Sequence, residues 1–587
     1  MGNRGTQTDD RRGWFARVLS TQMNLDMNIN NIARQWDLVI IGGGITGAGI
    51  LREATNMGLQ ALLVEQKDFA WGTSSRSSKL VHGGLRYLKE GHFLLTKMAV
   101  EEREHLLKEV PGLVEPLDFL LPVYEHMRPG KRTLKIGLSL YDLMARERKH
   151  RFYDKTEFYR RMPFARQQGL KGGFFFYDAQ VDDSRLVLRL INESVAAGAG
   201  ALNYTAAIEI LRNDSGDVVG VKIEDTETHE SRTLETPLVI NATGCWAEKL
   251  HPSPEPGRHL RPLRGSHLVI SAEVLPIKAG VAFVHPRDNR TIFVLPWEGA
   301  VLVGTTDLDH KTDLGVEPTI TEGEIAYLLE GLNAIFPSLN ISLNDCISAF
   351  AGLRPILSDG RLSPSAESRE HVVWADKGLV TVTGGKLTTF RRLAWDTLKA
   401  AKPFLVSQKF SDEHKPLFTR PPDRPHNRFG LADTVWRRLY GRYGQDADAL
   451  VQAAQAQDLE QIPATHTLWA ELPFVAANER VRHLGDLLLR RVRIGLLTPQ
   501  GGKEHLKRIR ALCQPALPWN SKRWKEEIAM YLELWKHSHA LPVQRTTPKR
   551  AKIFNPFAAV GHWFNRVVTK IWPKRWRSNP NPKPTNG

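Results

Sequence analysis

Short apolar runs recur along the first 400 residues, and several of them lead into stretches with helical periodicity. The first run, Leu38–Ile41, enters a glycine-rich turn and then a helical stretch, and the second run, Leu62–Val64, ends at an acidic residue. Later strand-like runs end in "NATG" at 241–244 and in "TGG" at 383–385, and a helical stretch follows the latter. Strands that alternate with helices in this way indicate an α/β fold.

The turn after the first run has the complete spacing of a dinucleotide-binding fingerprint. Gly42 permits a tight turn, Gly44 lets a pyrophosphate approach the backbone, and Gly47 lets the helix pack closely on the strand. The helix N-terminus then offers partial positive charge and N–H groups to the phosphates. Glu65 is placed to accept hydrogen bonds from a ribose, and its charge disfavours the 2′-phosphate of NADP. The cofactor contacts expected here are Gly42, Gly44, Ile45, Thr46, Gly47, Glu65 and Gln66.

Three further segments favour FAD over NAD, a choice that the fingerprint alone leaves open. The "NATG" run is placed to return to the cofactor, and Gly384 and Gly385 form a third glycine turn that feeds a helix. The segment "GTSSRSSKLVHGGLRYL" at 72–88 follows the second strand, where the chain must pass beside an extended FAD; a solvated loop is the alternative. The expected contacts are Thr73, Ser74, Ser75, Ser78, Lys79, Leu80, His82, Gly83, Gly84, Ala206, Ala242, Thr243, Gly244, Gly384, Gly385, Lys386, Leu387 and Thr388.

Length and composition place these elements in a large globular chain. With 587 residues, 42% of them apolar, the chain is long enough for two or three domains. Its three cysteines lie far apart without a CxxC spacing, which argues against a disulfide framework, a zinc site or an iron–sulfur cluster. The net charge of +16 is concentrated at one end, because residues 541–587 hold ten Lys or Arg and no Asp or Glu.

Taken together, the motifs resemble those of the FAD-dependent, respiratory glycerol-3-phosphate dehydrogenases. In chain order they are "IGGGITGAGI", "GTSSRSSKLVHGGLRYL", "YDAQVDDSRL", "NATGCWA", "GSHLVI", "PWEGAVLVGTTD", "GLRPIL" and "TGGKLTTFRRLA". The resemblance implies an α/β, two-dinucleotide-binding (glutathione-reductase-like) FAD fold with an antiparallel substrate-binding sheet, plus a C-terminal α-helical domain. Within the sheet, "TIFVLPWEGAVLVGTTD" predicts a hairpin around "EG".

Domain boundaries follow from the extent of this resemblance and from composition. The domains expected are a flexible N-terminal extension at 1–34, an FAD-dependent oxidoreductase domain at 35–400 whose substrate sheet lies mainly in 255–350, a Pro-rich linker at 401–430, a helical domain at 431–540 and a basic amphipathic tail at 541–587.

The resemblance implies oxidation of sn-glycerol 3-phosphate at C2 to dihydroxyacetone phosphate, with hydride passing to flavin N5. Such a site needs a cationic clamp for the dianionic phosphate and a group that accepts the hydroxyl proton. The substrate-binding residues expected are Arg86, Tyr87, Arg354, Arg369 and Lys386. Arg354 is also expected to act in catalysis, and for Arg369 a structural ion pair is an equal alternative.

His267 in "GSHLVI" is the expected catalytic base, since nearby cations would lower its pKa and keep the ring neutral. His82 is the competitor, although its neighbours suggest that it lines the flavin. A histidine buried for structural reasons is the alternative for either residue.

The carboxylates of "YDAQVDDSRL" predict a helix start rather than a metal site. Asp182 or Asp183 is placed to cap the apolar run that follows, and together with Asp178 they fit no metal-ligand spacing. We expect no metal, because hydride transfer to a flavin needs none. The chain has no GxSxG motif, which argues against a hydrolase.

The tail carries an amphipathic stretch, "NPFAAVGHWFNRVVTKIWP", with an Asn cap and Pro at both ends. It is too short to span a bilayer and predicts a helix lying in an anionic membrane surface through residues 555–577; docking on the protein itself is the alternative. With no apolar signal segment at the start, the expected location is cytoplasmic, peripherally bound to the cytoplasmic face of the inner membrane. The resemblance adds a membrane quinone as electron acceptor.

Two rival functions remain open from the sequence. One is a glycerol-3-phosphate oxidase that uses oxygen, or another FAD enzyme acting on amino acids; the basic clamp and the membrane-seeking tail weigh against both. The other is a flavin-containing RNA-binding protein whose tail acts as a basic arm with stacking aromatics. We expect no specific nucleic acid, and a homodimer is possible.

Overall fold

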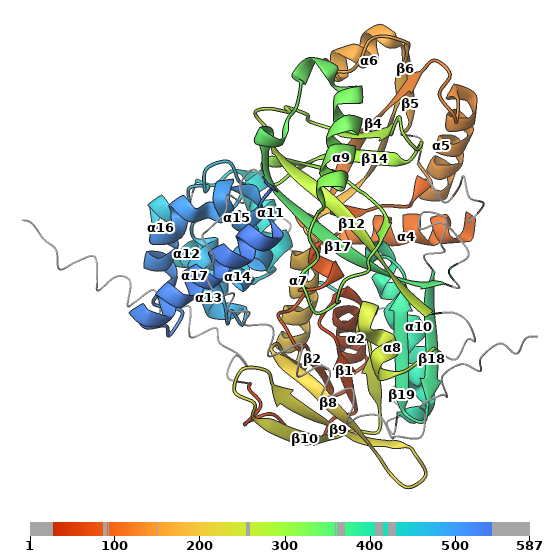
Figure 1. Cartoon of the computed structure of the whole chain (residues 1–587). Coiled ribbons are helices and arrows are strands. Elements are labelled where there is room, and N and C mark those ends of the chain that lie inside the picture. The colour runs from red at the N-terminus through yellow and green to blue at the C-terminus, as the bar shows by residue number, and fades with distance from the viewer. Residues whose placement is uncertain are drawn as a thin grey trace, which may run out of the picture.

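Six strands form the sheet that carries the dinucleotide fingerprint (Figure 1). The computed structural model describes residues 27–85, 88, 91, 93–147, 149–253, 259–358, 360, 370–405, 415–420 and 430–542. In spatial order the strands are β18 (His371–Asp376), β19 (Leu379–Gly384), β11 (Val239–Asn241), β1 (Leu38–Ile41), β2 (Ala61–Val64) and β7 (Gly200–Leu202). Every neighbouring pair is parallel except β18 with β19.

This sheet is buried on both faces, which explains its continuous apolar strands. Leu38 and Ile40 of β1 pack toward a layer of three helices, α2 (Ile45–Asn56), α7 (Asp183–Ala196) and α10 (Phe390–Ala401). Val39 and Ile41 point to the other side, toward an antiparallel sheet of three strands. Those strands are β8 (Thr205–Arg212), β9 (Val218–Asp225) and β10 (Ser231–Glu235). The two-dinucleotide-binding, glutathione-reductase-like arrangement that we expected is confirmed.

A second, ten-stranded sheet stands beside the first. Its order is β16 (Leu308–Asp309), β12 (His259–Ser271), β15 (Ala300–Gly304), β14 (Thr291–Trp297), β13 (Gly280–Val284), β4 (Val114–Tyr124), β6 (Leu170–Val181) and β3 (Leu80–Val81), with β17 (Cys346–Ser358) paired to β12 and β5 (Arg151–Tyr153) to β6. Four of these strands, β3 to β6, come from residues 80–181, so the substrate sheet draws on much more of the chain than 255–350. These four strands join the rest of the sheet through the pairing of β13 with β4. The two paired strands are far apart in the sequence, and no local sequence pattern predicts that they meet.

The hairpin predicted around "EG" is confirmed. Trp297 at the end of β14 pairs with Ala300 at the start of β15, and Glu298 and Gly299 between them have φ of 49° and 95°. Two consecutive residues with positive φ give a turn whose twist matches that of the paired strands.

Helices flank the second sheet and build the C-terminal domain. Those near the sheets are α4 (Phe93–Glu109), α5 (Lys131–Ala145), α6 (Lys155–Arg161), α8 (Ala247–Leu250) and α9 (Glu322–Ile335). The C-terminal domain comprises α11 (Asp433–Tyr443), α12 (Asp446–Ala453), α13 (Glu471–Asn478), α14 (Leu484–Asp486), α15 (Ile494–Leu497), α16 (Leu506–Cys513) and α17 (Ser521–Ser538). No helix within these described parts is both long and apolar enough to cross a membrane.

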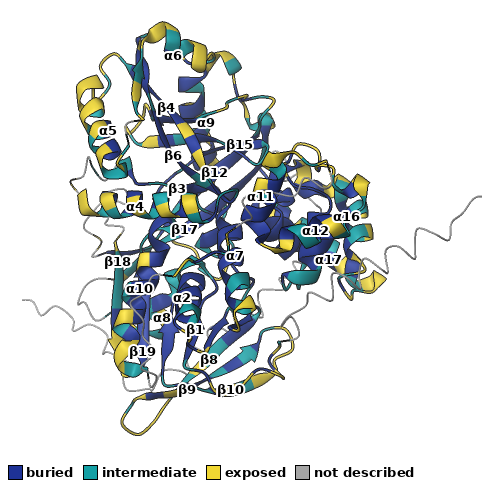
Figure 2. Cartoon of the chain, turned by 180° about the vertical axis from the view of Figure 1, so that it is seen from behind, coloured by how far each residue is buried: buried dark blue, intermediate teal, exposed yellow. Residues whose placement is uncertain are grey.

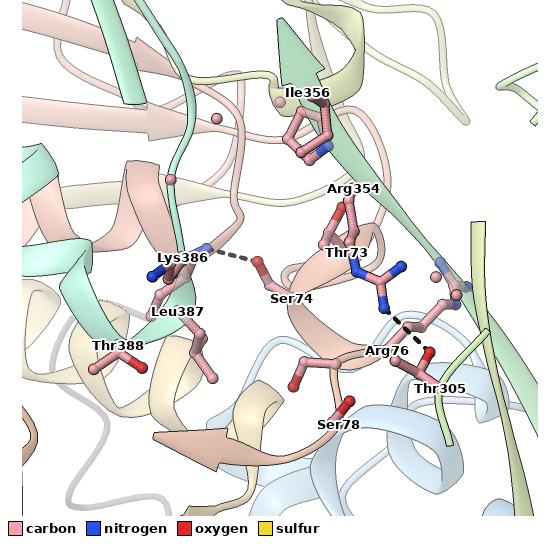
Figure 3. A pocket seen from close by; sticks show the side chains of 18 of the residues that line it. Thr73, Ser74, Arg76, Ser78, Thr305, Arg354, Ile356, Lys386, Leu387 and Thr388 are labelled. Carbon is pink, nitrogen blue, oxygen red and sulfur yellow. Dashed lines mark hydrogen bonds between the residues drawn. The ribbon is translucent and has the colours of Figure 1, made fainter. Parts of the chain in front are cut away.

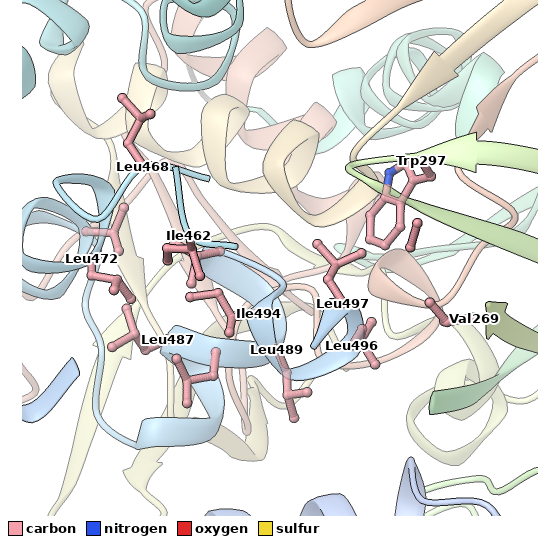
Figure 4. Packing of buried hydrophobic residues seen from close by; sticks show 14 of the residues in the cluster. Val269, Trp297, Ile462, Leu468, Leu472, Leu487, Leu489, Ile494, Leu496 and Leu497 are labelled. Atoms are coloured by element: carbon pink, nitrogen blue, oxygen red, sulfur yellow. The ribbon is translucent and has the colours of Figure 1, made fainter. Parts of the chain in front are cut away.

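The core of the helical domain is continuous with the substrate sheet. Leu496 and Leu497 of α15 belong to the same buried cluster as Val269 of β12 and Trp297 of β14, and Figure 4 shows them facing one another. A shared core of this kind fixes the helical domain on the sheet.

The N-terminal extension departs from the prediction of flexibility where it is described. Ile29 and Ile32 are 5% and 1% exposed and pack in the cluster that contains Val39 and Ile41. These two side chains cover the edge of the layer between the two sheets of the first domain, so burial of apolar surface orders residues 27–34. Residues 1–26 lie outside the described part of the chain.

Candidate functional site

The fingerprint turn joins β1 to α2 with its glycines tightly packed. Gly42 has φ of 116°, and a Cβ there would lie 2.6 Å from the carbonyl oxygen of Ala242 in the neighbouring crossover. A Cβ on Gly47 would collide with the carbonyl oxygen of Gly42. The helix therefore approaches the strand as the fingerprint requires, and its first residues, Ile45 and Thr46, line the space beside the turn.

Glu65 directly follows β2 and lies next to this turn. Its carboxylate accepts hydrogen bonds from the backbone N–H of Gly43 at 2.7 Å and of Lys67 at 2.9 Å. Burial raises the pKa of Glu65, although both backbone hydrogen bonds favour the ionised form. The side chain is thus held at the carboxyl end of the strand, where the sequence predicted a ribose contact.

One cavity of about 830 Å³ begins at the turn and reaches the substrate sheet. A cavity of this size is within the usual range for cofactor sites. Most predicted cofactor contacts line it: Gly42, Gly44, Ile45, Thr46, Glu65, Gln66, Thr73, Ser74, Ser78, Leu80, His82, Gly84, Ala206, Ala242, Thr243, Gly244, Gly384, Gly385, Lys386, Leu387 and Thr388. Gly47, Ser75, Lys79 and Gly83 lie behind this wall rather than in it.

The wall of the cavity fits a long, flat, phosphate-bearing group such as FAD. The glycines at the turn leave backbone bare, and a Cβ on Gly44 would come within 3.1 Å of Ser74 Oγ, which already accepts the Ile45 N–H at 2.9 Å. At the far end, Gly384 and Gly385 have φ of 79° and 75°, a backbone conformation that favours glycine. No side chain therefore projects from these two positions into the cavity.

Lys79 has a structural role instead of a place in the cavity wall. Its ammonium group is fully buried and pairs with Asp183 at 2.7 Å, and it also donates to the carbonyl oxygen of Ser75. Burial lowers the pKa of Lys79 to about 8, while Asp183 opposes that shift. A buried ammonium needs such a partner, so Lys79 ties the serine-rich segment to the start of α7.

Cationic side chains stand at the substrate-sheet end of the cavity. Arg354 of β17 donates hydrogen bonds to Thr305 Oγ1 at 3.1 Å and to Asp307 Oδ1 at 3.0 Å. It crosses over Gly265 of β12, where any side chain would collide with the guanidinium group. Figure 3 shows Arg354 and Lys386 on opposite sides of the open space, arriving from different sheets.

His267 does not line the cavity, because Ser78 lies between the His267 ring and the cavity. His267 Nε2 lies 2.8 Å from Ser78 Oγ, and the ring stacks on Phe350 with centroids 4.8 Å apart. The buried Nδ1 has no hydrogen-bond partner among the described residues. Burial, together with the charges of Lys79 and Arg354, places the pKa of His267 well below its usual range, so the ring is neutral near pH 7.

Three predicted substrate residues, Arg86, Tyr87 and Arg369, lie outside the described residues. His82 lines the cavity, and its N–H donates to Thr388 Oγ1 at 3.1 Å, which supports a position beside the cofactor rather than a role as base. Sequence analysis did not single out Arg290 and Asp307, which line the cavity beside Arg354. The turn "HPRDNRT" contains no sequence motif that would mark Arg290 as a binding residue.

The helix start predicted at the carboxylates of "YDAQVDDSRL" is confirmed at Asp182. Asp182 caps α7 by accepting the Arg185 N–H, and it also pairs with Arg442 and Arg493 of the helical domain. Asp178 accepts a hydrogen bond from Tyr141. In the described ranges no group of His, Cys, Asp or Glu could hold a metal ion.

Comparison with known proteins agrees with this geometry. The model of the FAD dependent oxidoreductase family matches residues 37–391, and that of the C-terminal domain of alpha-glycerophosphate oxidase matches 415–524. Aerobic glycerol-3-phosphate dehydrogenase from Staphylococcus haemolyticus is 33% identical, over 79% of this chain and 87% of its own. The enzyme of that name from Staphylococcus aureus (strain USA300) is 34% identical, over 78% and 86%.

Solved structures extend the likeness to three dimensions. Glycerol-3-phosphate dehydrogenase from Bacillus halodurans, complexed with FAD, has a TM-score of 0.67 at 26% identity, covering 89% of this chain and 98% of its own. L-alpha-glycerophosphate oxidase from Mycoplasma pneumoniae, with a TM-score of 0.52 at 18% identity over 63% and 95%, shares the fold. Fold and site thus define an FAD-dependent oxidoreductase. The chain belongs to the family of the aerobic glycerol-3-phosphate dehydrogenases.

Proposed function

We propose that the protein oxidises sn-glycerol 3-phosphate to dihydroxyacetone phosphate with FAD and passes the electrons to a membrane quinone. The observation that carries this proposal is the single cavity that joins the dinucleotide turn to the cationic end at Arg354 and Lys386. The substrate specificity named for the Staphylococcus relatives supports the phosphate ester as the ligand of that end.

The side chains divide the chemistry between binding and proton transfer. Arg354 and Lys386 attract the dianionic phosphate, the former through a fork of N–H donors and the latter as a compact charge. When bound, FAD supplies the acceptor for the hydride that leaves C2. The C2 hydroxyl gives its proton to Ser78 Oγ as the Ser78 proton moves to the neutral His267 Nε2.

The outer faces of α4 and α5 support a membrane-borne acceptor. Leu134 of α5 lines the cavity, whereas Ile136 and Leu143 on the opposite face of that helix are 70% and 72% exposed. On α4, Phe93 and Leu94 are 52% and 71% exposed, and Figure 2 shows the exposed residues of both helices. The α4–α5 face comprises Phe93, Leu94, Lys97, Lys131, Arg132, Lys135, Ile136 and Leu143.

Apolar side chains among cations suit an anionic bilayer surface. This face would add to the tail at 555–577, which lies outside the described residues, and a peripheral attachment at the cytoplasmic face of the membrane is part of the proposal. A quinone entering from the bilayer would meet the apolar part of the cavity near Leu134 and Phe293.

The substrate is tested by anaerobic titration of the purified holoenzyme. We expect sn-glycerol 3-phosphate to bleach the oxidised-flavin band, whereas glycerol and an amino acid at the same concentration leave it unchanged. Bleaching by the amino acid, or a flavin band untouched by all three compounds, would refute the proposed substrate.

The acceptor is tested by following reoxidation of the reduced enzyme on anionic liposomes that contain a quinone. We expect reoxidation by quinone to exceed that by dissolved oxygen and to fall in Ile136→Asp/Leu143→Asp. Val219→Asp on β9 is the matched control, because Val219 is 46% exposed outside the α4–α5 face. Faster reoxidation by oxygen, with no effect of liposomes, would favour the oxidase alternative.

A further inference from the structure

The β13–β14 loop brings a second guanidinium group beside Arg354. Arg290 Nη2 lies 3.5 Å from Asp307 Oδ2, while Arg354 Nη1 lies 3.0 Å from Asp307 Oδ1, so one carboxylate holds both arginines. The main chain of Arg290 is fixed by two hydrogen bonds, its N–H to Asp288 Oδ1 at 3.1 Å and its carbonyl oxygen from the His285 N–H at 2.7 Å. Arg290, Asp307 and Arg354 all line the cavity.

The two guanidinium groups are partly exposed where they border the cavity, whereas the carboxylate between them is buried. The Asp307 side chain is 1% exposed, whereas those of Arg290 and Arg354 are 20% and 22% exposed. Within the described part of the chain, the Arg290 guanidinium group makes no side-chain hydrogen bond, and its ion pair to Asp307 is long. Its N–H donors therefore remain available to an anion in the cavity.

Cationic groups gather at this end of the cavity. One guanidinium group would neutralise Asp307, yet two approach it, and Lys386 adds a third cation on the opposite wall. Bidentate guanidinium groups are also the donors that best match phosphate oxygens.

We propose that Arg290 is a second phosphate-binding guanidinium group and that Asp307 is the positioning residue that holds Arg290 and Arg354 side by side. The pair selects a phosphate monoester over the free polyol. This inference rests on the proposed function, and it adds Arg290 and Asp307 to the clamp expected from the sequence.

Asp307 is itself firmly anchored, as a positioning residue must be. Its neighbour Thr306 donates from Oγ1 to Glu324 Oε1 at 2.7 Å, and Arg354 donates to the Thr306 carbonyl oxygen. Glu324 in turn pairs with Arg264 at 3.0 Å. The carboxylate of Asp307 is thereby fixed against β12 and α9.

The test compares anaerobic flavin reduction by sn-glycerol 3-phosphate with reduction by glycerol, supplied at a far higher concentration, in Arg290→Gln, Arg290→Lys and the wild-type holoenzyme. We expect Arg290→Gln to lower the ratio of kcat/KM for the two substrates at least tenfold, and Arg290→Lys to restore part of that ratio. Inorganic phosphate serves as a non-reacting probe, and its inhibition constant should rise in parallel. Arg287→Gln is the matched control, since Arg287 lies on the same loop, pairs with Glu330 and stands outside the cavity wall.

Three results would overturn the inference. If Arg290→Gln slows both substrates equally, or leaves phosphate inhibition unchanged, Arg290 is only a structural counter-ion of Asp307. If Asp307→Asn tightens phosphate binding, the carboxylate competes with the phosphate and does not position the clamp. Failure of the wild type to react with glycerol 3-phosphate would instead refute the proposed function, while phosphate binding would still test Arg290.

Discussion

Ser78 Oγ and His267 Nε2 lie 2.8 Å apart, and of the two residues only Ser78 lines the cavity. The sequence assigned Ser78 to the cofactor and His267 to the base, as separate parts of the site. In the proposed mechanism their contact joins the two roles, because a proton taken from a ligand in the cavity would reach the imidazole through the serine hydroxyl. The neutral state of the buried ring makes it able to accept that proton.

We predict that His267→Gln lowers the rate of flavin reduction roughly 10²- to 10⁴-fold, the usual range for losing a general base. Ser78→Ala should lower it by a similar factor, and the double variant should be little slower than either single one, since both act in one step. Stopped-flow reduction under anaerobic conditions measures these rates. Ser78→Thr keeps a hydroxyl and serves as the control; additive losses would show that the two residues act separately.

His483 gives the fold a pH-dependent contribution to stability. Burial disfavours its charge, but hydrogen bonds to Glu227 of the β9–β10 turn and to Glu527 of α17 prevail and raise the pKa of His483 to about 10. A raised pKa stabilises the fold fully below the unfolded value near 6.5, and the contribution is lost as pH rises toward 10.

We therefore predict that the midpoint of thermal unfolding falls between pH 7 and 10 more steeply in the wild type than in His483→Gln. The contribution at pH 7 should be on the order of 4 kcal/mol. Differential scanning calorimetry across this range measures it. Parallel curves for the two proteins would show that the imidazolium does not stabilise the contact between the first domain and the helical domain.

Gly47→Ala should abolish flavin binding, because the added Cβ would collide with the Gly42 carbonyl oxygen and force α2 away from β1. Gly137→Ala in α5 is the matched control, since a Cβ there meets nothing within 4 Å. It should stabilise the protein by about 0.5–1 kcal/mol through helix propensity. Flavin content after purification and the unfolding midpoint separate the two effects, and normal flavin content in Gly47→Ala would contradict the packing argument.

Asp68→Asn should destabilise the protein by roughly 3–5 kcal/mol, as expected when one partner of a buried ion pair is removed. Asp68 is fully buried and bonds Arg490 and Arg491 of the helical domain, which lower its pKa to about 2 against the opposing effect of burial. Glu115→Gln is the control, because its pair with Arg437 also crosses to the helical domain but is exposed, and should cost at most about 1 kcal/mol. Denaturant unfolding measures both, and equal losses would refute the burial argument.

Local sequence determined the elements that depend on a few neighbouring residues. The turn at Gly42 and Gly47, the cap of α7 by Asp182 and the hairpin at Glu298 were all predicted, because each is set by backbone conformation or by hydrogen bonds within a few residues. Most of the cofactor contacts predicted from the fingerprint and the two glycine segments do line the cavity, since those residue types serve few other purposes at that spacing.

Only the tertiary structure decided which side chains meet. Lys79 faces Asp183 instead of the cavity, His267 stands behind Ser78, and Arg290 joins Arg354 through Asp307. The partners of Lys79 and His267 are more than 100 residues away along the chain, and their approach depends on how β12 pairs with β17 and how the second sheet packs on the first. The burial of whole faces of sheets and helices determines these pairings. The sequence around a single residue therefore does not show which distant side chain it will contact.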